Sequence, residues 1–114
     1  MKKRTRLLLL SATLLTGVAL FLLITLVRYE PARQLSSFPI PKSAKVLQTL
    51  PHGYESEWAS ASEENGIPWS YQLVLKMKGW HEGERMGAST IYTKGTQKVD
   101  IVSTTERLDI QLVE

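Results

Sequence analysis

The chain has 114 residues, with 14 Lys and Arg, 11 Asp and Glu, and no Cys. Four of the basic residues lie in the first six positions and every acid lies after residue 27, so residues 28–114 carry ten basic and eleven acidic side chains, a net charge of −1. This division argues against a basic nucleic-acid-binding surface, and the lack of Cys excludes disulfides and a cysteine-linked lipid.

The longest apolar segment is residues 7–27, which holds 21 residues and no charge. At ~1.5 Å per residue a helix of this length spans about 31 Å, close to the thickness of a bilayer's hydrocarbon core. A signal sequence typically has a shorter apolar region, ~7–15 residues, followed by a small-x-small cleavage site, and no such site precedes Pro31. We therefore predict a basic cytoplasmic tail over residues 1–6 and a retained transmembrane helix over residues 7–27.

The basic residues set the predicted orientation of this helix. Lys2, Lys3, Arg4 and Arg6 precede the apolar segment, and an excess of Lys and Arg holds a helix end in the cytoplasm. We thus predict a single-pass protein of the cell membrane with its C-terminal part outside the cytoplasm.

Small side chains recur along one side of the predicted span. Residues at this spacing allow two helices to approach closely, although Gly, Ala and Thr are also common in spans that pack against nothing. The candidate helix-packing residues are Ala12, Thr13, Thr16, Gly17 and Ala19.

Residues 28–41 contain three Pro and a Ser pair, a composition that predicts a short extended linker. Residues 42–114 then form one small extracytoplasmic domain, enough for a single modest core. We predict strands over residues 45–50 and 54–59, joined by a turn at residues 51–53. Ser60 and Glu63 have the spacing of a capping box, which predicts a short helical turn ending at Asn65 and Gly66.

Residues 67–80 fit both a helical and a strand period, and periodicity alone leaves the two alternatives open. The ends favour a helix, because Pro68 suits a first turn and Gly79 suits a C-terminal cap. Beyond a solvated loop around residues 81–84, alternating patterns predict strands over residues 87–93, 98–104 and 108–113. The predicted fold class is α+β, with one N-terminal transmembrane helix followed by a small antiparallel sheet packed against one helix.

Two groups of residues carry a resemblance to known proteins. The first is Pro39-x-Pro41 with Ala44, Lys45 and Val46, then Tyr71-x-x-x-Leu75-x-x-x-Gly79-Trp80 and Tyr92-x-Lys94-Gly95; the second is residues 61–68 with Gly79-Trp80. The domain resembles small α+β modules of bacterial anchored proteins and is similar to uncharacterised single-pass membrane proteins of spore-forming Gram-positive bacteria. The resemblance implies a helix packed on a sheet, and it implies no activity.

The residues give little support for catalysis or for a bound cofactor. The two histidines, His52 and His81, are too few for a zinc site, and His81-Glu82-Gly83-Glu84 lacks a second His. The outer serines lack a nucleophile motif, and the glycines lack a phosphate-binding spacing. We therefore predict no catalytic, cofactor-binding or metal-binding residues, and a protein that is not an enzyme.

Glu55 and Glu57 share one face of a predicted strand beside Trp58, an arrangement that would suit a hydrolase using two carboxylates. A solvated acidic face explains the same pair, and we favour it.

The prediction for function is a binding or accessory domain that contacts another envelope protein or a wall component. Trp69 points away from Tyr71 on a helix, so we expect it to be exposed and available to a partner. The candidate contact residues are Trp69, Glu55, Glu57, Glu63 and Glu64. Two alternatives stay open: a small subunit that docks through its transmembrane helix, and, with less support, the hydrolase.

Overall fold

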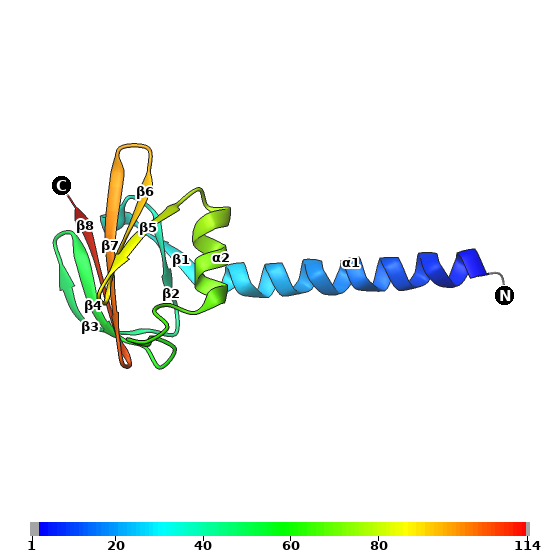
Figure 1. Ribbon diagram of the computed structural model, residues 1–114, viewed down its shortest axis with the longest axis horizontal. Coiled ribbons are helices and arrows are strands. Elements are labelled where there is room, and N and C mark those ends of the chain that lie inside the picture. Colours follow the sequence, from blue (N-terminus) through cyan, green and yellow to red (C-terminus); the bar gives the residue numbers. More distant parts are fainter. Residues whose placement is uncertain (1–2, 114) are drawn as a thin grey trace.

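The computed structural model describes residues 3–113 (Figure 1). A long N-terminal helix, α1 (Lys3–Val27), projects from one side of a small domain, and the molecule measures 61 × 30 × 25 Å. Residues 1–2 of the predicted basic tail lie outside the described residues, and Arg4 and Arg6 belong to α1. The helix is long and apolar enough to be a membrane span or a signal sequence.

The domain is α+β, as predicted, with a six-stranded antiparallel sheet at its centre. The strands lie in the order β3-β4-β8-β7-β6-β5. Their bounds are β3 (Lys45–Leu50), β4 (Gly53–Glu57), β5 (His81–Met86), β6 (Ser89–Lys94), β7 (Gln97–Thr104) and β8 (Arg107–Val113). The predicted meander of the last three strands is confirmed, because β6, β7 and β8 pair in sequence order.

The predicted linker over residues 28–41 is wrong. This segment forms a two-stranded ribbon, β1 (Tyr29–Ala32) and β2 (Phe38–Pro41), joined by a single 3₁₀ turn, η1 (Arg33–Leu35). A lone ribbon tolerates proline because both of its strands have an unpaired edge where no N–H is needed, and Pro31 stands opposite Pro39. The folded domain therefore begins at Tyr29.

Aromatic side chains from the ribbon complete the core over one face of the sheet. The Tyr29 ring stacks on Tyr71 at 4.8 Å between centroids, and Trp58 meets both rings edge-on. A second cluster places Phe38 edge-on to Trp80 at 4.8 Å between ring centroids. Burial of this aromatic area supplies much of the stability of so small a domain.

The helical interpretation of residues 67–80 is confirmed by α2 (Trp69–Met77), which covers the same face of the sheet. Its buried side chains are Tyr71, Val74 and Leu75. The Tyr71 hydroxyl donates a 2.6 Å hydrogen bond to the Pro39 carbonyl, which ties α2 to the ribbon. After α2 the backbone turns at Gly79, whose φ of +90° lies in the region that favours glycine.

Two local predictions are corrected. The segment after Trp58 contains turns and a single bridge between Ser62 and Gly66 in place of the predicted helical turn. The Ser62 hydroxyl accepts the Asn65 N–H at 3.2 Å, so the side chain caps a turn without starting a helix. Residues 81–84, predicted as a loop, belong to β5, which pairs with β6.

Candidate functional site

The C-terminal end of α1 packs against the domain. Arg28 is the one residue between α1 and β1. Thr25 is 5% exposed and Leu26 packs against the buried core. The junction between the helix and the domain is therefore part of the folded core.

The outward face of α2 is apolar at its centre. Trp69 is 65% exposed and Met77 is 47% exposed, with Leu73 partly exposed between them. These residues lie four apart, so they share one face of the helix opposite the buried side chains. Trp69 also meets α1, because its ring stacks on Phe21 with centroids 6.1 Å apart and an interplanar angle of 27°.

Two hollows adjoin these helices. One, of about 410 Å³, lies between α2 and β5 and is lined by Trp69, Gln72, Leu73, Lys76, Trp80, His81, Glu82 and Tyr92. The other, of about 660 Å³, lies beside the end of α1 and is lined by Leu23, Ile24, Val27, Arg28, Lys42 and Ser43. The second hollow is apolar along α1 and carries two cations at its domain end, and the Lys42 N–H donates a 2.9 Å hydrogen bond to the Arg28 carbonyl.

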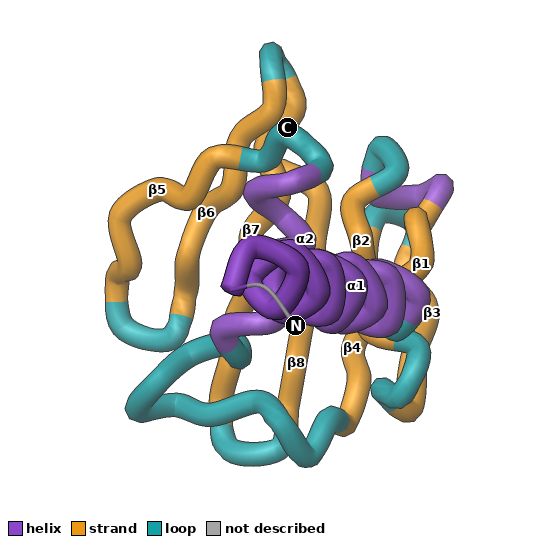
Figure 2. Tube along the Cα trace, turned by 90° about the vertical axis from the view of Figure 1, so that its right-hand side faces the viewer, coloured by secondary structure: helices purple, strands orange, loops and turns teal. Residues whose placement is uncertain are grey.

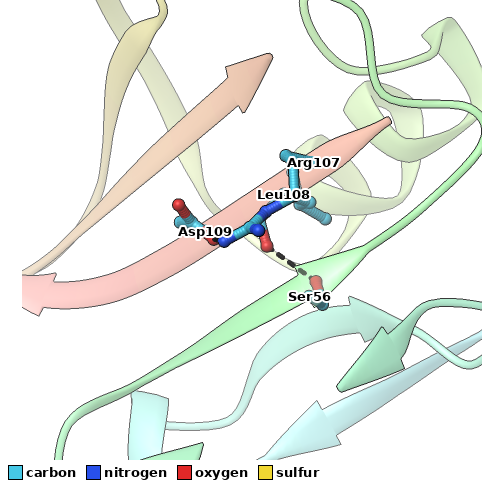
Figure 3. Close-up of polar contacts among 4 residues, drawn as sticks. All are labelled: Ser56, Arg107, Leu108 and Asp109. Carbon is cyan, nitrogen blue, oxygen red and sulfur yellow. Dashed lines mark hydrogen bonds and ion pairs between the residues drawn. The ribbon is translucent and has the colours of Figure 1, made fainter. Parts of the chain in front are cut away.

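The other face of the sheet is open and carries the predicted carboxylates. Glu55 stands opposite Asp109 of β8, and Glu57 stands opposite Arg107. The Arg107 guanidinium lies 3.7 Å from an Asp109 carboxylate oxygen, which accepts no hydrogen bond among the described residues. The intervening Ser56 points to the core side and donates a 2.6 Å hydrogen bond to the Leu108 carbonyl (Figure 3).

The two outer strands of the sheet differ in character. β5 has the sequence HEGERM and is exposed along its whole length. β3 is also exposed, but it presents Val46 and Leu47, which are 46% and 44% exposed. Its register shifts between Val46 and Gln48. Charged side chains on an outer strand discourage pairing with a strand of another protein. The sequence of β5 therefore protects it against such pairing, and that of β3 protects it less.

The candidate contact residues do not form one surface. Glu55 and Glu57 project from the open face of the sheet, and Trp69 lies on the helix that covers the opposite face. Glu63 and Glu64 lie in the loop before α2, where their carbonyl oxygens accept hydrogen bonds from the Arg85 guanidinium.

The apolar face of α2 beyond Trp69 was not predicted, although Trp69, Leu73 and Met77 are spaced four residues apart in the sequence. The exposed edge of β3 was not predicted either. No sequence signal distinguishes an outer strand from an inner one when its apolar residues alternate weakly.

The candidate packing residues of α1 lie on an exposed part of the helix. Thr13 and Gly17 line a hollow of about 490 Å³ along the helix surface, together with Leu10, Leu14, Val18 and Phe21. Ala12, Thr16 and Ala19 do not line it, and the Thr16 hydroxyl donates a hydrogen bond to the Ala12 carbonyl.

Within residues 3–113, no group of three His, Cys, Asp or Glu side chains converges as a metal site would require.

No protein-family model, curated protein or solved structure matches the chain. The resemblance to single-pass proteins of Gram-positive bacteria therefore stays a prediction.

Proposed function

We propose that the chain is a single-pass membrane protein, with its N-terminus in the cytoplasm, whose outer domain binds another protein of the cell envelope. The supporting features are the apolar helix α1, the Lys and Arg that precede it, and a domain attached directly to the end of that helix.

The packing of α1 favours a retained anchor over a cleaved signal sequence. Cleavage near the end of α1 would remove Thr25 and Leu26, which pack against the domain, and would expose the core residues beneath them. A signal sequence gains nothing from such packing, whereas an anchor that fixes the position of its domain does.

The observation that carries the binding role is the outer strand β3. An outer strand presents unpaired N–H and C=O groups to which an extended segment of another protein can add as a further strand. Val46 and Leu47 supply apolar contacts for such a segment. The β3–β4 hairpin lies at the end of the domain away from α1 (Figure 1), where an envelope protein can reach it.

Photocrosslinking in cells tests this role. A photoreactive amino acid replaces Leu47 on β3 or, as the matched control, Glu84 on β5 at the opposite edge of the sheet. We expect a defined crosslinked product from position 47, lost when Val46 is also replaced by Lys, and none from position 84. Equal products from both positions, or none from position 47, would overturn the proposed binding edge.

The hollow at Thr13 and Gly17 favours a second candidate function, a small subunit that docks through α1. Replacing residues 7–19 by Leu leaves the junction with the domain intact and removes the small residues. If a crosslinked partner from position 47 disappears in this variant, α1 is the recognition element. If the product persists, the domain recognises the partner.

A further inference from the structure

The outward face of α2 is directed toward the N-terminal end of α1. Figure 1 shows α2 running roughly perpendicular to α1 at the side of the domain from which α1 projects, with the sheet on the opposite side of α2. In Figure 2, viewed along α1 from its N-terminal side, α2 crosses behind α1 and lies in front of the sheet. Because the buried side of α2 faces the sheet, its exposed side faces the region through which α1 runs.

The stacking of Trp69 on Phe21 sets the depth of this face. Phe21 precedes Val27 by six residues, so it lies about 9 Å below the C-terminal end of α1. Helices that lie in a bilayer interface bury their apolar face ~5–10 Å into the boundary between headgroups and acyl chains. The Trp69 ring centroid is 6.1 Å from that of Phe21, so the Trp69 ring lies near that depth when α1 spans the bilayer.

The residues around this face match the layers of an interface. Trp is enriched at membrane–water interfaces, and Lys side chains extend from apolar surroundings toward headgroups. Lys76 is exposed beside Met77 at the end of α2. On the other side of the junction, Arg28 and Lys42 lie at the end of an apolar hollow along α1. The two cations followed by an apolar wall match the order of phosphate and acyl chain in a phospholipid.

We propose that α2 lies in the outer interface of the bilayer and seats the domain on the lipid surface through Trp69, Leu73 and Met77. This inference rests on the proposed function, because it requires α1 to span the membrane. It assigns Trp69 to lipid, whereas the sequence alone suggested contact with an envelope protein or a wall component. The occupant of the α2 face is the phospholipid bilayer, continuous with the lipid around α1.

Nitroxide accessibility in the full chain tests the inference. The chain has no Cys, so a single introduced Cys carries the only label. Three variants, Val18→Cys on α1, Met77→Cys on α2 and Gln111→Cys on the open sheet face, are reconstituted in vesicles of phosphatidylcholine and phosphatidylglycerol. Collisions with oxygen, which concentrates in lipid, and with a water-soluble nickel chelate report the depth of each label.

We expect the label at position 18 to be deep, that at position 111 to be aqueous, and that at position 77 to have a several-fold lower nickel accessibility than position 111. If the label at position 18 is deep and the label at position 77 is as accessible to nickel as that at position 111, α2 does not lie in the interface. That result would overturn the inference and leave the membrane span intact. Nickel access at position 18 would overturn the span, and the inference with it. Shielding of position 77 from both reagents would show a protein surface on α2 and overturn the assignment to lipid.

A pair of substitutions at Trp69 separates lipid contact from folding. Trp69→Gln in the Met77→Cys background is expected to raise nickel accessibility at position 77, and Trp69→Phe to leave it low. The side chain is 65% exposed, so neither change opens the core. Equal nickel accessibility in the two variants would contradict a role for Trp69 in seating the helix.

Discussion

Phe38 tests whether residues 28–41 belong to the folded domain. Its side chain is 0% exposed, and its ring centroid lies 4.8 Å from that of Trp80 and 6.0 Å from that of Tyr92. Truncating a buried Phe to Ala costs ~3–5 kcal/mol, because it removes apolar contacts and leaves a cavity. A domain of this size has a free energy of unfolding of about 4–13 kcal/mol, so Phe38→Ala removes a large part of it.

Thermal unfolding of the full chain in detergent, followed by near-UV circular dichroism, measures this loss. At ~4–8 °C per kcal/mol, we expect the Tm of Phe38→Ala to fall by at least about 12 °C. Gln34→Ala is the matched control, because Gln34 lies in the same segment and is exposed. It should change the free energy of unfolding by no more than about 0.5 kcal/mol. Similar small effects from both substitutions would show that the segment is a linker and would refute the ribbon.

Three further predictions concern the core. Tyr71→Phe removes a buried hydrogen bond to β2 and leaves a carbonyl unpaired, so the free energy of unfolding should fall by ~1–3 kcal/mol in urea titrations. Burial raises the pKa of Tyr29, Tyr71 and Tyr92 above the usual value for tyrosine, so their contribution to stability is complete below about pH 10 and declines as the pH rises further. Denaturation measured from pH 8 to 12 checks this, and constant stability would contradict it. Gly53→Ala places a methyl group 2.5 Å from a backbone oxygen of β8 and should destabilise the domain by ~1–3 kcal/mol, whereas Gly17→Ala meets nothing within 4 Å and should not.

The elements predicted correctly are those whose sequence carries a periodic pattern or clear end signals. Leu108, Ile110 and Leu112 alternate with polar residues, and Gly79 marks the end of α2. These local signals agree with the tertiary packing, so the meander and the helix follow from sequence alone.

The elements missed are those defined by their partners. β5 is exposed on both faces, so no apolar alternation identifies it, and it is a strand because it pairs with β6. The ribbon was missed because Pro31, Pro39 and Pro41 are typical of linkers, and tolerance of proline in a two-stranded ribbon becomes visible only when the partner strand is known.

The candidate site shows the same limit. The exposure of Trp69 followed from its helical position, but its neighbour Phe21 lies 48 residues away in sequence. No local pattern joins α2 to the end of α1, and that contact changes the interpretation of Trp69 from a free surface residue to one that packs beside α1.

Labelling of single cysteines in intact cells tests the central claim, a retained span with its domain outside. A membrane-impermeant maleimide should label Gln111→Cys in intact cells and Thr5→Cys only after permeabilisation, on a protein of full-length mass that stays in the membrane after carbonate extraction. A product shortened by the length of α1, or a Gln111→Cys label that requires permeabilisation, would contradict the account.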